Sequence, residues 1–236
     1  VEIPLDETAL MQEVDALVAQ EVRSVAIIFL HAYANPVHEH RAVELISEKY
    51  PDLYITASYD VAPEIREYER ASTTAVNAFI KPLAQEYLNL LSQKIEEIGI
   101  TGAFFLMLSN GGLTHIEEAK RSPVQLLESG PAAGTLAGSY FGLKSGHPNV
   151  LAFDMGGTTA KLSLIDDGEP QVTYAFEAAR EKRFMEGSGL PIKISTIELI
   201  EIGAGGGSIS HVDDLGLLKV GPQSSGADPG PACYGQ

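Results

Sequence analysis

The order of apolar and polar positions predicts that the chain begins with a small unit of alternating helices and strands. Apolar residues recur at helical spacing over residues 5–21, and residues 24–33 form a continuous apolar run that suits a buried strand. A helix is expected from Pro36 to about Lys49, and a second strand over residues 53–58. This order predicts a βαβ-like unit with parallel strands.

The next part of the chain is highly charged over residues 60–71, which favours a change of structural unit there. Ser72 and Thr73 then offer N-caps for a long helix, because the following apolar residues keep three- and four-residue spacing. Pro82 falls inside this pattern and is expected to kink the helix or to mark a restart.

A further helix is expected to open at Ser129, with Pro131 at an early helical position. The helix is rich in alanine and glycine, so another element should pack tightly against it. The N-terminus of a helix is also a ready anion site. Anion binding and close packing therefore both remain open as roles for residues 129–134.

Residues 151–165 are the most informative stretch of the chain, because they predict two strands joined by a tight glycine turn. Gly156 and Gly157 carry no Cβ, so an anion can approach the backbone N–H groups closely. Thr158 and Thr159 add hydroxyl donors to the same turn. The turn therefore has the groups needed to hold phosphate oxygens.

Two charged side chains flank this turn. Asp154 ends the first strand and supplies a hard carboxylate oxygen that suits Mg²⁺ or one of its waters, while Lys161 supplies a nearby cation. The combination fits a nucleotide phosphate tail with its metal. The alternative is an ordinary hairpin, because Gly-Gly between alternating apolar residues is typical of one. The segment is not a P-loop, since the residues after the turn alternate like a strand.

A second glycine cluster, Gly205, Gly206 and Gly207, follows another predicted strand. Free amides here could contact a nucleotide base, ribose or phosphate. The alternative is a sharp turn packed against a neighbouring element. Three consecutive glycines give more backbone freedom than a turn needs, which favours a ligand.

The composition narrows the classes of partner and compartment. Among 236 residues, 44% are hydrophobic and 20% charged, and the formal net charge is −16. This charge argues against nucleic acid or an anionic membrane as a partner, so local N–H groups and metal must hold any anionic ligand. The only cysteine is Cys233, which excludes a disulfide framework and makes a reducing cytoplasm the expected compartment. The apolar runs are too short to span a bilayer.

The segment His38-Glu39-His40 looks like a pair of metal ligands, but it falls early in a predicted helix. Positions i and i+2 of a helix face apart. We therefore expect a solvated helix surface here, with a metal site as the alternative.

Several stretches together resemble the hydantoinase A/oxoprolinase family, which includes ATP-dependent N-methylhydantoinase A subunits, 5-oxoprolinases and subunits of acetone or acetophenone carboxylases. They follow one another in order over nearly the whole chain. The matching stretches are Ser24–Pro36, Arg66–Ala78, Ser109–Gly112, Glu128–Gly134, Asp154–Lys161, Gly203–Ser208 and Gly221–Gly235.

This resemblance implies the actin, sugar kinase and heat-shock chaperone superfamily, in which two related lobes clamp ATP–Mg²⁺. The expected fold is an α/β, ribonuclease H-like ATPase lobe with a mixed sheet flanked by helices and a partial βαβ unit at the N-terminus. Residues 1–60 resemble the end of the N-terminal lobe, and residues 61–236 resemble most of the second lobe. The family's first Asp-x-Gly-Gly-Thr turn is absent, so the chain is expected to be a piece of a longer protein.

The resemblance also implies roles for the residues of the two glycine clusters. Asp154 is expected to hold Mg²⁺, residues 156–159 to bind the phosphates of ATP, Lys161 to stabilise charge and residues 205–207 to contact the nucleotide. The implied activity is ATP-dependent hydrolysis of a hydantoin or a 5-oxoproline-like lactam through phosphorylation of the amide oxygen. A ketone carboxylase subunit and a nucleotide-gated reactivating chaperone are the alternatives. A hydantoinase B-type subunit or domain is the expected partner, and the chain alone is expected to be inactive.

Overall fold

The computed structural model describes residues 3–174, 176–180, 185, 187–226, 228–231 and 235, so Cys233 lies outside the described residues. The chain divides into two compact units. Unit 1 comprises Val1–Leu108, Gly112–Leu127 and Tyr174–Ser195, and unit 2 comprises Ser109–Gly111, Glu128–Thr173 and Thr196–Gln236. Within the described ranges, no helix is both long enough and apolar enough to cross a membrane.

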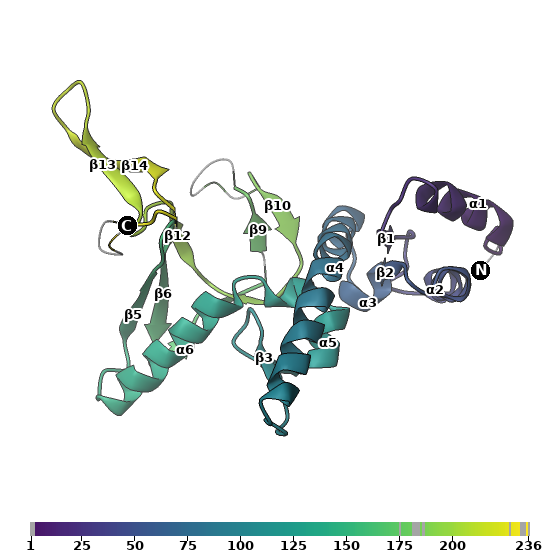
Figure 1. The fold of residues 1–236 in the computed structure, drawn as a ribbon, viewed down its shortest axis with the longest axis horizontal. Helices are drawn as coiled ribbons and strands as arrows, with labels where there is room; N and C mark the ends of the chain where they lie inside the picture. Colours follow the sequence, from purple (N-terminus) through teal and green to yellow (C-terminus); the bar gives the residue numbers. More distant parts are fainter. Residues whose placement is uncertain are drawn as a thin grey trace. The chain divides into compact units, whose positions relative to one another are not determined.

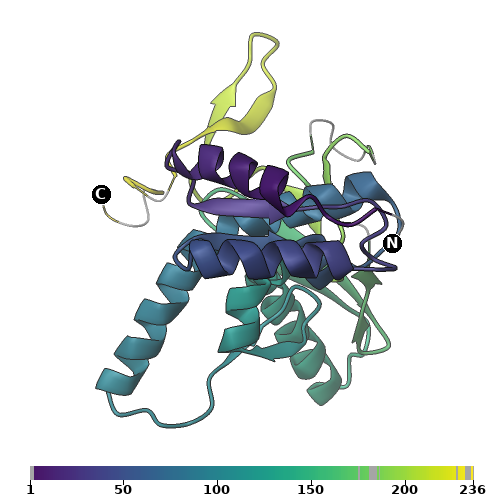
Figure 2. The same ribbon diagram turned by 90° about the vertical axis from the view of Figure 1, so that its right-hand side faces the viewer.

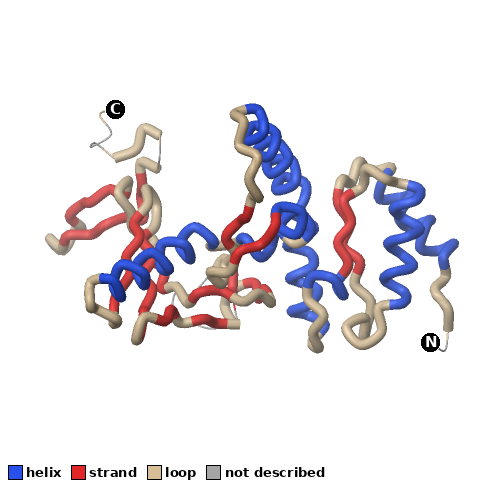
Figure 3. Tube along the Cα trace, turned by 90° about the horizontal axis from the view of Figure 1, so that it is seen from below, coloured by secondary structure: helices blue, strands red, loops and turns tan. Residues whose placement is uncertain are grey.

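A parallel two-stranded sheet lies at the centre of the first part of unit 1. Strand β1 (Ser24–Ile27) pairs in parallel with β2 (Tyr54–Ala57). Helices α1 (Glu7–Val18) and α2 (Val37–Lys49) lie on one side of this pair, and α4 (Glu67–Glu97) lies on the other (Figures 1 and 3). The predicted βαβ unit is confirmed.

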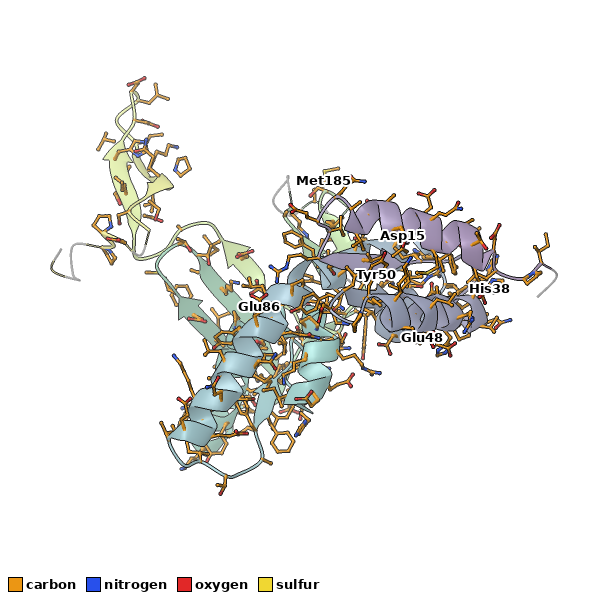
Figure 4. All side chains as sticks on the ribbon, turned by 45° about the vertical axis from the view of Figure 1, so that its right-hand side comes forward. Asp15, His38, Glu48, Tyr50, Glu86 and Met185 are labelled. Atoms are coloured by element: carbon orange, nitrogen blue, oxygen red, sulfur yellow. The ribbon has the colours of Figure 1, made fainter. Side chains whose placement is uncertain are left out.

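Helices α1 and α2 pack side by side over the sheet (Figure 2). At their ends, the carboxylate of Asp15 accepts hydrogen bonds from the ammonium of Lys49 at 2.7 Å and from the hydroxyl of Tyr50 at 2.6 Å. Asp15 and Tyr50 are labelled in Figure 4. These bonds, chiefly the one from Lys49, lower the pKa of Asp15. The polar contact therefore joins the two helices at an exposed edge.

Strand β1 is shorter than the apolar run that predicts it. It ends at Ile27, and the chain then turns, with His31 in the left-handed region at φ 58°. The buried guanidinium of Arg70 donates to the carbonyl oxygen of Phe29 over 3.1 Å and holds this turn. The strand predicted over residues 24–33 is wrong beyond Ile27, because polar contacts to side chains replace sheet pairing there.

Glu39 is buried beneath the same turn, with 0% of its surface exposed. Its carboxylate accepts hydrogen bonds from the Phe29 N–H at 2.8 Å, the Ser58 hydroxyl at 2.7 Å and the Tyr59 N–H at 2.9 Å. A buried charge is tolerated only with such partners. The expectation of a solvated surface over residues 38–40 is therefore wrong for Glu39, which links α2 to the chain after each strand.

Helix α4 is continuous, so the predicted restart at Pro82 does not occur. Proline leaves the carbonyl four residues before it without its helical donor. That carbonyl, of Ala78, accepts instead from the hydroxyl of Ser24 at 2.7 Å. Ser72 and Thr73 are buried within the helix, which begins several residues before them, so the predicted caps are wrong.

The remaining elements of unit 1 are short. They are α3 (Ser58–Val61), the antiparallel pair β3 (Phe105–Met107) and β4 (Leu113–His115), α5 (Ile116–Arg121), the 3-10 helix η1 (Pro123–Leu126), and the antiparallel pair β9 (Phe176–Ala178) and β10 (Leu190–Ile192).

Unit 2 is built on an antiparallel sheet. Its strands run in the order β12–β6–β5, with β7 also paired to β6. Their bounds are β5 (Val150–Met155), β6 (Ala160–Asp166), β7 (Glu169–Pro170) and β12 (Ile200–Ile202). The predicted strand–turn–strand over residues 151–165 is confirmed. Unit 2 also contains two antiparallel pairs, β8 (Val172–Thr173) with β11 (Thr196–Ile197), and β13 (Ser208–Val212) with β14 (Leu218–Ser224).

Helix α6 (Ser129–Lys144) lies against β5 and β6 (Figure 1). Its glycines permit the contact, because a methyl group on Gly138 would lie 3.3 Å from the Cβ of Ala152, and one on Gly142 would lie 2.5 Å from a methyl of Val150. The predicted close packing against this helix is confirmed.

Candidate functional site

The turn between β5 and β6 leaves several amide groups available. Its first amide, of Gly156, donates to the carbonyl oxygen of Thr159 at 2.9 Å. Within the described part of the chain, the backbone N–H groups of Gly157, Thr158 and Thr159 donate to no protein acceptor. Successive free N–H groups at a tight turn are a typical anion-binding arrangement.

The second glycine cluster braces this turn. The N–H of Gly206 donates to the carbonyl oxygen of Gly156 at 2.9 Å, and the N–H of Gly207 donates to that of Gly157 at 2.7 Å. The N–H of Gly205, the third amide of the cluster, donates to the hydroxyl oxygen of Ser208 at 2.9 Å. The expectation that these amides are free is therefore wrong, because two backbone segments approach too closely for side chains. A nucleotide contact by residues 205–207 stays a prediction.

A cavity of about 260 Å³ opens between the first turns of α6 and the strands β5 and β6, and the turn residues 156–159 are not among those that line it. A water molecule takes up about 30 Å³ in the liquid, so this cavity has room for an ion together with several waters. Its lining lies wholly within unit 2 and consists of Pro131, Gly134, Thr135, Ala152, Phe153, Asp154, Lys161, Ser163 and Leu199.

The cavity and its neighbours carry more negative than positive charge. The ammonium of Lys161 bonds to the carboxylate of Glu128 and lies 3.6 Å from that of Glu201, and its side chain is only 15% exposed. Asp154 lies directly opposite Lys161 in the sheet register and adds another carboxylate to the lining. The cavity therefore favours a cation, or an anion that brings its own metal, over a bare anion.

Glu128 is held in an unusual backbone conformation. It lies immediately before α6 with φ 62°, in the left-handed region that costs a non-glycine residue about 1 kcal/mol or more. Its carboxylate there meets Lys161, 33 residues away in the sequence. Sequence reasoning missed this pair, because no local spacing rule relates the two positions.

The donor set fits a hydrated Mg²⁺ ion. Asp154 offers carboxylate oxygens, but the described residues contain no group of three or more His, Cys, Asp or Glu that could hold a metal. Mg²⁺ is commonly bound by one or two carboxylates, several waters and the phosphates of a substrate. Asp154 would therefore hold the ion together with waters and nucleotide oxygens.

Ser163 is a lining residue that sequence reasoning did not single out. Side chains alternate across a strand, so residues 161 and 163 share one face of β6. This alternation was the signal that could have placed Ser163 beside Lys161.

Comparison with known proteins settles the family. A family model described as hydantoinase/oxoprolinase matches residues 70–236, and a model described as the hydantoinase/oxoprolinase N-terminal region matches residues 1–50. The chain belongs to the hydantoinase/oxoprolinase family. The resemblance that its motifs carry is thereby confirmed.

Several curated relatives match almost the whole chain. An uncharacterized protein of Methanocaldococcus jannaschii is 43% identical over 99% of this chain and 35% of its own length. Caprolactamase subunit alpha of Pseudomonas jessenii is 37% identical over 99% of this chain and 32% of its own length. Acetophenone carboxylase gamma subunit of Aromatoleum aromaticum is 32% identical over 98% of this chain and 31% of its own length. The chain thus spans about a third of these relatives, two of which are named as subunits.

Two solved structures share the fold. The crystal structure of the ATP-dependent caprolactamase from Pseudomonas jessenii matches 98% of this chain and 32% of its own, with a TM-score of 0.76 and 36% identity. A nucleotide-free structure of acetone carboxylase matches 95% of this chain and 31% of its own, with a TM-score of 0.76 and 27% identity. The expected fold class is confirmed, in agreement with the actin-like ATPase lobe of this family.

Proposed function

We propose that this chain is part of the ATP-binding subunit of an enzyme that hydrolyses a cyclic amide. The observation that carries the proposal is the turn at residues 156–159, where the N–H groups of residues 157–159 have no acceptor in the protein, together with Asp154, which shortly precedes the turn and lines the cavity. The similarity to caprolactamase subunit alpha, at 37% identity, supports a lactam as the substrate, and the hydantoinase/oxoprolinase family model supports a hydantoin as the other cyclic amide.

The chemical reason for ATP is the stability of the amide. The γ-phosphoryl group passes to the amide oxygen, so that a new O–P bond forms and the O–P bond to ADP breaks. Water adds to the activated carbon, and the ring C–N bond breaks as the nitrogen takes a proton. A second water attacks the carbon of the resulting acyl phosphate and releases phosphate. The products are the ring-opened amino acid, ADP and phosphate.

The residues of the turn would position the phosphates for this transfer. The N–H groups of residues 157–159 would donate to phosphate oxygens, and Asp154 would hold Mg²⁺. When bound, Mg²⁺ would neutralise phosphate charge. Lys161, fixed by Glu128, would place a positive charge beside the same site. Such positioning and charge neutralisation supply most of the catalysis in phosphoryl transfer.

The proposal extends to the rest of the enzyme. Residues 1–60 would end the N-terminal lobe and residues 61–236 would form most of the second lobe, so the ATP clamp is completed by a segment beyond this chain. A hydantoinase B-type subunit or domain would be its partner, in a reducing cytoplasm. The chain alone would therefore be inactive.

A ketone carboxylase is the second candidate, favoured by the 32% identity to acetophenone carboxylase gamma subunit. In that case a ketone enol oxygen would accept the phosphoryl group of ATP and ADP would leave. The phosphorylated enol would then form a C–C bond to CO₂, or to carboxyphosphate with release of its phosphate, while the enol O–P bond breaks and water takes the phosphoryl group as phosphate. The turn and Asp154 would perform the same task in both reactions.

Release of phosphate from ATP by the complete protein, with its partner, distinguishes these candidates. The panel is hydantoin, 5-oxoproline, caprolactam, acetone and acetophenone, the ketones with bicarbonate. We expect one cyclic amide to stimulate release at least tenfold. Stimulation by ketones alone would transfer the assignment to the carboxylase, and stimulation only by a protein partner would indicate a reactivating chaperone.

A further inference from the structure

We propose that Ser163 belongs to the cation site, where its hydroxyl bonds a water of the metal held at Asp154. This inference rests on the proposed function, because it requires a divalent cation to arrive with the nucleotide.

The first observation is a buried hydroxyl without a partner. Ser163 is 3% exposed, and its Oγ has no hydrogen-bond partner. In the described part of the chain, the Ser163 Oγ is the only buried side-chain nitrogen or oxygen of unit 2 that has no hydrogen-bond partner. Buried polar groups are nearly always paired, so an orphan on the wall of a cavity indicates an occupant that completes it.

The second observation is the register of the two strands. Ala152 lies opposite Ser163 and Asp154 opposite Lys161, so all four side chains share the sheet face that α6 covers. Gly134 on α6 leaves space there, because a Cβ on it would meet only the Asp154 carboxylate, at 4.0 Å. The Ser163 hydroxyl and the Asp154 carboxylate therefore line the same cavity.

The lining gives the Ser163 hydroxyl no protein partner of its own. The hydroxyl of Thr135, on the α6 side of the cavity, already donates to the carbonyl of Pro131 at 3.0 Å. The ammonium of Lys161 bonds to Glu128 and not to the Ser163 hydroxyl, and it lies near Glu201. The Ser163 hydroxyl is therefore open to a partner that comes with the ligand.

The charge of the cavity identifies that ligand as a hydrated cation. The carboxylates of Asp154, Glu128 and Glu201 outnumber the single ammonium of Lys161, and this negative balance repels a bare phosphate. Waters bound to Mg²⁺ direct their protons outward and need acceptors. The Asp154 carboxylate and the Ser163 oxygen are acceptors of that kind, and the volume of about 260 Å³ accommodates the ion with its waters.

The test is Ser163→Ala in the complete protein, with Mn²⁺ binding read by electron paramagnetic resonance in the presence of ADP. We expect the Mn²⁺ dissociation constant to rise about tenfold, as for other groups that orient the waters and ligands of a metal. The melting temperature without ligand should stay equal or rise, because the variant removes an unpaired buried hydroxyl. ADP affinity in EDTA should not change.

Ser139→Ala is the matched control, since the buried Ser139 hydroxyl donates to the Gly168 carbonyl at 2.5 Å in the same unit. It should lower the melting temperature and leave Mn²⁺ affinity unchanged.

Ser163→Cys keeps the side-chain size but accepts hydrogen bonds poorly, so it should reproduce the loss of Mn²⁺ affinity if the alanine variant does not fold. Mn²⁺ affinity within twofold of wild type in the Ser163 variants would overturn the inference, whereas a wild-type protein that binds neither ADP nor Mn²⁺ would overturn the proposed function itself.

Discussion

Asp154→Asn is expected to reduce substrate-stimulated phosphate release at least a hundredfold. Asp154 is the acidic residue of the cavity lining, and it lies near the end of β5, just before the turn with the free amides. An asparagine keeps the shape of the side chain but loses the charge that holds Mg²⁺, and an electrostatic contact to a transferring group is worth about a hundred- to a thousandfold in rate. Phosphate release from ATP with the best substrate of the panel measures the effect.

Asp166→Asn provides the control for this variant. Asp166 lies at the exposed end of β6, on the strand that carries Lys161, and does not line the cavity. The rate of substrate-stimulated phosphate release by the Asp166→Asn variant should stay within twofold of the wild-type rate. If Asp154→Asn retained more than half of the wild-type rate, the carboxylate would have no part in holding the metal.

Gly205→Ala is the second change with a large expected effect. A methyl group at this position would lie 2.7 Å from the carbonyl oxygen of Gly156 and from the amide nitrogen of Thr158. Both are backbone atoms, so they cannot rotate away as a flexible side chain would. We expect a loss of about 3 kcal/mol in the free energy of unfolding, as for other overpacked sites, together with weaker nucleotide binding.

Gly206→Ala is the matched control, because its methyl group would lie 3.7 Å from the Gly156 oxygen, an ordinary contact. The two variants add the same methyl group to adjacent residues, so the difference between their stabilities and ADP affinities reports the close approach of the glycine cluster to the turn. Thermal unfolding measures the stability of each variant, and ADP titration measures its affinity. Equal stability and equal ADP affinity would show that the cluster does not support the turn.

Much of the fold follows from local pattern. The alternation over residues 151–165 and the Gly-Gly between its two halves predict β5, the turn and β6, because strand period and turn chemistry act within a few residues. The same holds for α2, whose predicted bounds nearly match Val37–Lys49. The facing of Asp154 and Lys161 across the hairpin also follows from that local geometry.

The features that local pattern did not predict depend on residues far apart in the chain. Glu39 looks like a surface residue in its own helix, and only the turn after β1 and the start of α3 bury it. Gly206 donates to the Gly156 carbonyl across two segments that the sequence alone does not bring together. The Glu128–Lys161 ion pair likewise forms only once α6 packs on the sheet.

The fate of the amide oxygen tests the central claim most directly. The complete protein is given ATP and a cyclic amide labelled with ¹⁸O at the carbonyl, and the released phosphate is analysed by mass spectrometry. Transfer of the phosphoryl group to the amide oxygen, followed by attack of water on the carbon of the acyl phosphate, predicts one ¹⁸O atom in each phosphate. Phosphate free of ¹⁸O, with the label retained in the ring-opened carboxylate, would contradict it.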